Sequence, residues 1–205
     1  MKHARKRKRR TPWLILPILL LAAAIAVWIT KTEYGFARDV SPEEEEARLS
    51  VVAAAEEWLG YNEADGSHHS IIDLYNSQTE LPRGYPVTYE DAWCSAFVTA
   101  VAIKTGNTAR IPPECSCDEQ IELFQENGTW EENDDYVPLP GDVIFYHWDC
   151  TALHCDHWTD HVGIVVGTRF GRILVIEGNK NNSVEYRVLS IGDPCIRGYG
   201  IPPYA

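Results

Sequence analysis

The sequence has no internal repeat and no low-complexity tract, and outside its first ten residues it has few basic side chains. Seven of its 18 Lys and Arg residues lie within residues 1–10, which leaves 11 basic residues against 30 acidic ones in the rest of the chain. Nucleic-acid binding needs a basic footprint, as does adhesion to an anionic surface by charge. The composition therefore argues against nucleic acid as a partner and against charge-driven adhesion.

The number of cysteines does not support a complete disulfide framework. The chain has six cysteines, and if one of them is a free nucleophile, the odd number left cannot all pair within the chain. Cys115 and Cys117 are too close in sequence for a comfortable mutual bridge, so we expect one of them to pair with Cys195 or to stay reduced. The remaining cysteines are Cys94, Cys150 and Cys155.

One apolar run suggests a membrane span. It begins at Trp13, has Trp28 near its end, and is at the short end of the lengths that cross a bilayer. Because a basic flank stays on the cytoplasmic side, we expect residues 1–12 to be a cytoplasmic tail, residues 13–30 to be a single-pass anchor in the lipid bilayer, and the rest to lie outside the cell. The alternative is a signal peptide cleaved within residues 22–26, which would release a secreted protein.

The chain after this span predicts helices first and strands later. Residues 31–47 are expected to form a stem and a helix start, where Ser41, Pro42 and several glutamates suit the cap and first turn. Residues 48–205 are expected to form one domain. Its fold class is α+β, with N-terminal helices packed on an antiparallel sheet. The predicted helices cover 42–59, 71–75, 91–105 and 118–125, and the predicted strands cover 143–147, 161–168, 173–177, 184–189 and 199–201.

Cys94 lies in the first turn of the third predicted helix. Asp91 suits the N-cap of that helix, and Gly106 suits the position just past its end. Unpaired backbone N–H groups and the positive end of the helix dipole favour a thiolate at Cys94 over a thiol. A thiolate is the attacking species in cysteine catalysis. The alternative is a small buried residue on a core helix.

A catalytic thiolate needs a base, and His161 is the candidate. His161 opens a predicted strand, so it is expected at the rim of the sheet, where it could face a helix end. Glu177 and Asn179 close the next strand, and in an antiparallel hairpin the start of one strand lies near the end of the next. Either Glu177 or Asn179 is therefore expected to orient His161.

Four short stretches in this order resemble CHAP domains, the cysteine, histidine-dependent amidohydrolases/peptidases. These are papain-like peptidoglycan hydrolases within the broad NlpC-type superfamily. The resemblance covers roughly Leu49 to Pro203. The four stretches are Trp93-Cys94-Ser95-Ala96-Phe97-Val98, Pro140-Gly141-Asp142-Val143-Ile144-Phe145, Asp160-His161-Val162-Gly163-Ile164-Val165 and Ile176-Glu177-Gly178-Asn179.

The resemblance implies a papain-like fold and acyl transfer without a cofactor. Cys94 matches the nucleophile, His161 the general base, and Glu177 and Asn179 the polar residues that close a CHAP site. The substrate would be an amide bond in peptidoglycan, either the muramoyl–alanine amide or a peptide bond in the stem or cross-bridge. The backbone N–H of Cys94 would help to hold the oxyanion.

The chain departs from the family between the first two predicted strands, in a long segment rich in Cys and His. A Cys150–Cys155 disulfide that closes a surface loop is the first interpretation, since the domain is expected outside the cell. A zinc site is the second, although the spacing fits no standard zinc pattern. Calcium bound by the aspartates of this segment is the third. The zinc candidates are Cys150, Cys155, His147, His154 and His157, and the calcium candidates are Asp149, Asp156 and Asp160.

Two rival functions remain open from the sequence. One is a catalytically silent CHAP-like domain that binds the cell wall or partner proteins. The other is a surface protein that senses metal or redox state through the Cys150–His157 segment. Trp148 and Trp158 suit either stacking on sugar rings or packing at the rim of the core.

Overall fold

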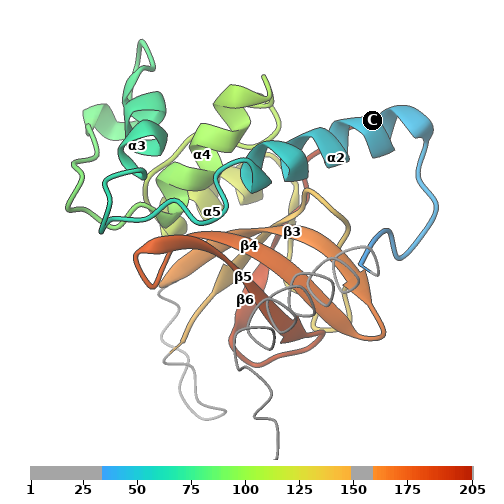
Figure 1. The fold of residues 1–205 in the computed structure, drawn as a ribbon. Coiled ribbons are helices and arrows are strands. Elements are labelled where there is room, and N and C mark those ends of the chain that lie inside the picture. Colours follow the sequence, from blue (N-terminus) through green and yellow to red (C-terminus); the bar gives the residue numbers. More distant parts are fainter. Residues whose placement is uncertain (1–33, 149–158, 205) are drawn as a thin grey trace, which may run out of the picture. The chain divides into compact units, whose positions relative to one another are not determined.

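The computed structural model describes residues 34–148 and 159–204. In these residues four α-helices precede most of a six-stranded sheet (Figure 1). The helices are α2 (Pro42–Glu56), α3 (His69–Asn76), α4 (Cys94–Lys104) and α5 (Cys117–Glu126), with a short 3₁₀ turn η2 (Pro82–Gly84). The strands are β1 (Trp130–Glu131), β2 (Val143–Tyr146), β3 (His161–Arg169), β4 (Arg172–Lys180), β5 (Ser183–Ser190) and β6 (Ile196–Gly200).

The sheet runs in the order β1-β6-β2-β3-β4-β5, and all its neighbouring strands are antiparallel. The hairpin between β3 and β4 turns at Phe170 and Gly171, both with positive φ. Figure 1 shows the helices gathered on one side of the sheet. The predicted α+β class and the antiparallel sheet are therefore confirmed. The two-residue strand β1 was not predicted, because it is too short to show an alternating pattern.

Apolar side chains fill both sides of the sheet. Between the helices and the sheet, the fully buried Phe97 of α4 packs in one cluster with Val162 and Ile176. On the other side, Val165 and Val175 belong to a smaller cluster. Because successive side chains in a strand point to opposite faces, strands that are buried on both sides read as nearly continuous apolar runs.

The Pro-Gly-Asp turn before β2 fastens helix α2 to the sheet. Asp142 is fully buried, and its carboxylate accepts a hydrogen bond of 2.8 Å from Arg48 of α2 and another from the Tyr136 hydroxyl. Arg48 also donates to the Pro140 carbonyl oxygen at 3.0 Å. Burial raises the pKa of Asp142, and the adjacent guanidinium opposes this shift. The Pro-Gly-Asp turn therefore has a structural role in this chain, because its Asp142 forms a buried ion pair with Arg48.

Gly178 allows strand β4 to pack directly against helix α4. A Cβ atom built at Gly178 would lie 2.4 Å from the Cβ of Phe97 and 2.9 Å from the Trp93 ring. No side chain larger than hydrogen fits there without moving the backbone. The glycine of the Glu-Gly-Asn stretch thus sets how closely the strand that carries Glu177 approaches the helix that carries Cys94.

Two expectations need comment. Asp91 was expected to cap helix α4, and this is wrong: the Asp91 carboxylate accepts from the backbone N–H and hydroxyl of Thr88, and Trp93 occupies the N-cap position. Among the described residues no helix is long and apolar enough to cross a membrane. The expected anchor at residues 13–30 lies outside the described residues.

Candidate active site

Cys94 is the first residue of helix α4 and so lies in its first turn, where it was predicted. The helix begins where Trp93, with φ of −118° and ψ of 18°, leaves helical geometry and accepts a hydrogen bond from the Phe97 N–H. Trp93 is fully buried, and its indole N–H donates to the Glu63 carboxylate at 3.1 Å. Trp93 is therefore held in a fixed position, and Cys94 lies beside the unpaired backbone N–H groups of the first turn of α4.

His161 and Glu177 meet across the strand pair β3–β4. The Nε2 atom of His161 lies 3.2 Å from Oε2 of Glu177, and the Glu177 side chain is fully buried. Gly163 makes this reach possible, because a Cβ at that position would lie 2.8 Å from Cγ of Glu177. Because Nε2 of His161 is hydrogen-bonded to Glu177, the Nδ1 atom is the ring nitrogen available to interact with Cys94.

Arg187 of strand β5 holds the other oxygen of the same carboxylate. Its Nε atom donates to Oε1 of Glu177 at 2.6 Å, while its guanidinium lies 4.4 Å from the ring centre of Trp148. Glu177 thus bridges a histidine and an arginine. A fully buried carboxylate with charged partners on both oxygens has a fixed orientation.

The charges of the site favour an ion pair between Cys94 and His161. The hydrogen bond with the Cys117 thiol lowers the pKa of Cys94 well below its ordinary value, and the adjacent His161 adds to this shift against the effect of burial. Burial on its own would lower the pKa of His161, but the hydrogen bonds with Cys94 and Glu177 outweigh burial and raise that pKa to about 9. At neutral pH the pair is therefore thiolate and imidazolium.

Cys117 contacts the same sulfur from helix α5. The Sγ atoms of Cys94 and Cys117 are 3.8 Å apart, and both residues are buried, with 7% and 8% of their surfaces exposed. The contact with Cys94 and burial raise the pKa of Cys117 well above its ordinary value. Cys117 is therefore the thiol that donates, and Cys94 is the thiolate that accepts.

Asn179 differs from Glu177 in its backbone conformation and in its exposure. It lies in the irregular step of the β4–β5 pairing, with φ of 58°, and is partly exposed. Of the two residues predicted to orient His161, the described part of the structure gives the hydrogen bond to Glu177. The predicted role of Asn179 in closing the site stays a prediction.

Most of the predicted metal candidates lie outside the described residues, as does the predicted Cys150–Cys155 disulfide. His147 is described and buried, with its Nδ1 atom 3.6 Å from Oδ2 of Asp160. The described residues contain no group of three or more metal-ligating side chains. Cys94, Cys115, Cys117 and Cys195 are free thiols, so the alternative in which Cys115 and Cys117 stay reduced holds in this structure.

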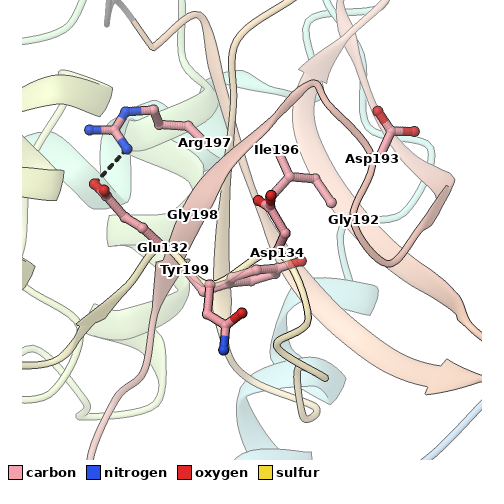
Figure 2. Close-up of a pocket in the computed structure, with 9 residues that line it drawn as sticks. Glu132, Asp134, Gly192, Asp193, Ile196, Arg197, Gly198 and Tyr199 are labelled. Carbon is pink, nitrogen blue, oxygen red and sulfur yellow. Dashed lines mark hydrogen bonds and ion pairs between the residues drawn. The ribbon is translucent and has the colours of Figure 1, made fainter. Parts of the chain in front are cut away.

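Two of the hollows on the described surface lie near elements that matter for the candidate site or the sheet edge. One, of about 280 Å³, lies beside the start of helix α4, where Ala92 and Cys115 line it together with Arg83, Tyr85 and Asp91. The other lies between the segment after β1 and strand β6, where Glu132 and Arg197 form an ion pair (Figure 2). Neither hollow has Cys94, His161 or Glu177 among its lining residues, but the first includes Ala92 and Cys115, which lie close in sequence to Cys94 and Cys117.

Sequence reasoning did not identify Arg187 or Cys117 as parts of this site. Arg187 belongs to the strand next to β4, in cross-strand register with Val175, and only the register reveals that it reaches Glu177. Cys117 was considered as a partner of Cys195 or as a reduced thiol, and its place directly before the predicted helix at 118–125 was the available signal.

One comparison with known proteins, the match to a family model, agrees with the resemblance seen in the sequence. Residues 84–179, which contain Cys94, His161, Glu177 and Asn179, match the family model of the CHAP domain. No curated protein matches the chain. A solved structure described as "The crystal structure of Ly7917" aligns with 78% of this chain at 15% identity and a TM-score of 0.37, and the chain spans 62% of its length, less than two thirds. The resemblance to CHAP domains is confirmed over these residues.

Proposed function

We propose that this protein is a membrane-anchored, extracellular cysteine hydrolase that cleaves an amide bond in peptidoglycan through Cys94, His161 and Glu177. The observation that carries the proposal is the charged pair at the start of helix α4. A buried cysteine with a lowered pKa contacts a histidine with a raised pKa, and that histidine is bound to a buried carboxylate. This arrangement matches what a cysteine nucleophile and its base require.

The mechanism follows from the positions of these groups. The Cys94 thiolate attacks the amide carbonyl carbon, and the free N–H groups of the first turn of α4 stabilise the oxyanion that forms. His161, which holds a proton in the resting pair, donates it to the departing amine. Water then attacks the acyl-enzyme with His161 as base, which releases the acid product and restores the thiolate.

Glu177 and Arg187 keep His161 in the orientation that this sequence of steps requires. Glu177 accepts from Nε2 of His161, and Arg187 fixes the other carboxylate oxygen. The His161 ring also lies 6.0 Å from the Tyr146 ring in a stacked arrangement, which limits its rotation. A histidine held in this way presents one nitrogen to Cys94 in both its charged and neutral states.

The substrate would approach by way of the hollow that Ala92 and Cys115 line, near the start of helix α4. This hollow is open to solvent and carries the phenol of Tyr85, the guanidinium of Arg83 and the carboxylate of Asp91. A peptide stem, which has amide and charged groups along its length, offers partners for such side chains. The two bond classes, muramoyl–alanine amide and peptide bond, remain alternatives for this hollow.

The basic residues 1–10 and the apolar run that follows support the proposed anchor. A membrane tether would raise the local concentration of an acidic enzyme at the cell wall without a charge-driven contact. Co-sedimentation of the full chain with membranes after alkaline washing tests this part of the proposal. Release of the whole protein into the soluble fraction would favour the secreted alternative.

The function itself is tested by digestion of purified peptidoglycan with the purified full chain, followed by mass spectrometry of the soluble products. Free stem peptides with intact glycan would identify a muramoyl–alanine amidase. Shortened or unlinked peptides would identify an endopeptidase. If several peptidoglycan chemistries yield no product, the catalytic proposal fails, and wall binding or sensing takes its place.

A further inference from the structure

The thiol of Cys117 lies in direct contact with the sulfur of Cys94. Cys94 and Cys117 begin helices α4 and α5, and their sulfurs are 3.8 Å apart in a buried contact. A disulfide has an S–S distance of about 2.05 Å, so the sulfurs need to approach by about 2 Å, which side-chain rotation and a small helix shift can supply.

We propose that Cys94 and Cys117 form an oxidative modification site, in which a hydroperoxide converts the two thiols into a disulfide that blocks the nucleophile. The inference rests on Cys94 as the nucleophile of the proposed function, and it assigns to Cys117 the role of resolving cysteine. It goes beyond hydrolysis because it adds a second reaction, with a different substrate, at the same sulfur.

The electrons and protons of this oxidation balance between the two thiols and the peroxide. The Cys94 thiolate attacks one peroxide oxygen, the O–O bond breaks, and Cys94 becomes a sulfenic acid while hydroxide leaves and takes up a proton as water. The Cys117 sulfur then attacks the sulfenic sulfur, the S–S bond forms, and the sulfenic oxygen leaves with the Cys117 proton as a second water. Two thiols lose two electrons in total, and the peroxide gains them.

Two features favour Cys117 over the other thiols as the resolving group, and a third identifies Cys94 as the thiol that is oxidised first. Cys117 contacts Cys94, whereas Cys115, two residues earlier, accepts a hydrogen bond from Arg83 at 3.4 Å. Cys195 lies in the segment between β5 and β6, where Asp193 and Arg187 rather than Cys94 are the charged groups that act on it. The lowered pKa of Cys94 also makes it the thiol that reacts first with a peroxide.

The disulfide would inactivate the enzyme in a reversible way. It removes the thiolate that attacks the amide, and it protects Cys94 from irreversible oxidation to sulfinic and sulfonic acids. A thiol reductant would restore both groups. Such a site suits a domain expected outside the cell, where reducing systems do not keep thiols reduced.

The test treats the reduced full chain with hydrogen peroxide and maps disulfides by mass spectrometry without reduction. In wild type and in Cys115→Ser we expect a Cys94–Cys117 cross-link. Activity on peptidoglycan should fall about tenfold or more and should return on addition of dithiothreitol. In Cys117→Ser the cross-link should be missing, and the activity lost to peroxide, relative to the untreated variant, should not return.

The Cys115→Ser variant is the matched control, because it leaves only one cysteine in the Cys115-Ser116-Cys117 stretch, and it identifies the cross-linked partner even if Cys117→Ser fails to fold. Cys94 recovered from that variant only as a sulfinic or sulfonic acid would overturn the proposal. A Cys94 cross-link that forms equally in Cys117→Ser would overturn it as well. The map needs no activity, so this result stays separate from the test of hydrolysis.

Discussion

Replacement of Cys94 by alanine is expected to lower the rate of peptidoglycan hydrolysis by about 10⁴-fold or more, because the thiolate is removed and the neighbouring Cys117 thiol, whose pKa is raised, does not replace it. His161 would keep its carboxylate partner, but it would have no thiolate to activate. The change removes one sulfur from a packed helix start, so the folded structure should persist. Release of soluble fragments from purified peptidoglycan measures the rate.

Cys195→Ala is the matched control for this prediction. Cys195 is also a free thiol, but it lies between β5 and β6, and its pKa is raised by burial rather than lowered. We expect this variant to hydrolyse peptidoglycan at the wild-type rate. If Cys94→Ala retained a tenth or more of the wild-type rate while both variants were folded, the thiolate mechanism would be wrong.

Replacement of Gly178 by alanine is expected to disturb both stability and activity, although the change adds a single methyl group. The new Cβ would lie 2.4 Å from the Cβ of Phe97, and rotation of the Phe97 side chain cannot relieve a clash with its Cβ. Strand β4 or helix α4 must therefore shift. Overpacking of this kind costs about 1–3 kcal/mol of unfolding free energy.

The same shift would separate Glu177 and His161 from Cys94. A displacement of about 1 Å in a catalytic arrangement can cost about 10²-fold in rate. Gly35→Ala is the matched control, because a Cβ at Gly35 meets no atom within 4 Å and its φ is not in the left-handed region. Thermal unfolding and hydrolysis rates should change in Gly178→Ala and stay near wild type in Gly35→Ala. A Gly178→Ala variant as active as wild type would show that the close approach of β4 to α4 is not needed.

Much of the fold was predictable because its elements carry strong periodic signals. Helix α2 begins where Ser41 accepts a hydrogen bond from the Glu44 N–H, the capping contact that the sequence predicted. The strands that carry His161 and Glu177 are long, apolar and bounded by turns. Helix α4 was predicted because the apolar pattern from Phe97 onward marks it, but it begins at Cys94 rather than near Asp91, since Trp93 occupies the N-cap position.

The sequence predicted that Cys94, His161 and Glu177 would lie near one another, but it did not predict the residues that contact them. Cys94, His161 and Glu177 occupy helix and strand ends, and chain order with antiparallel pairing brings such ends together. Arg187 and Cys117 come from elements whose neighbours depend on strand register and on how α4 and α5 pack. These tertiary contacts leave no mark on the local sequence.

The most direct test of the central claim is the rate at which iodoacetamide alkylates Cys94 as a function of pH. A thiolate paired with imidazolium should react at a rate that depends on pH much less than that of an ordinary thiol over about pH 6 to 8, since the pKa of Cys94 is lowered. The rate at Cys195, whose pKa is raised, should rise about tenfold per pH unit over the same range. In His161→Ala, the rate at Cys94 near neutral pH should fall. A Cys94 rate that climbs with pH in parallel with that of Cys195, unchanged by His161→Ala, would contradict the thiolate–imidazolium pair on which the proposed function depends.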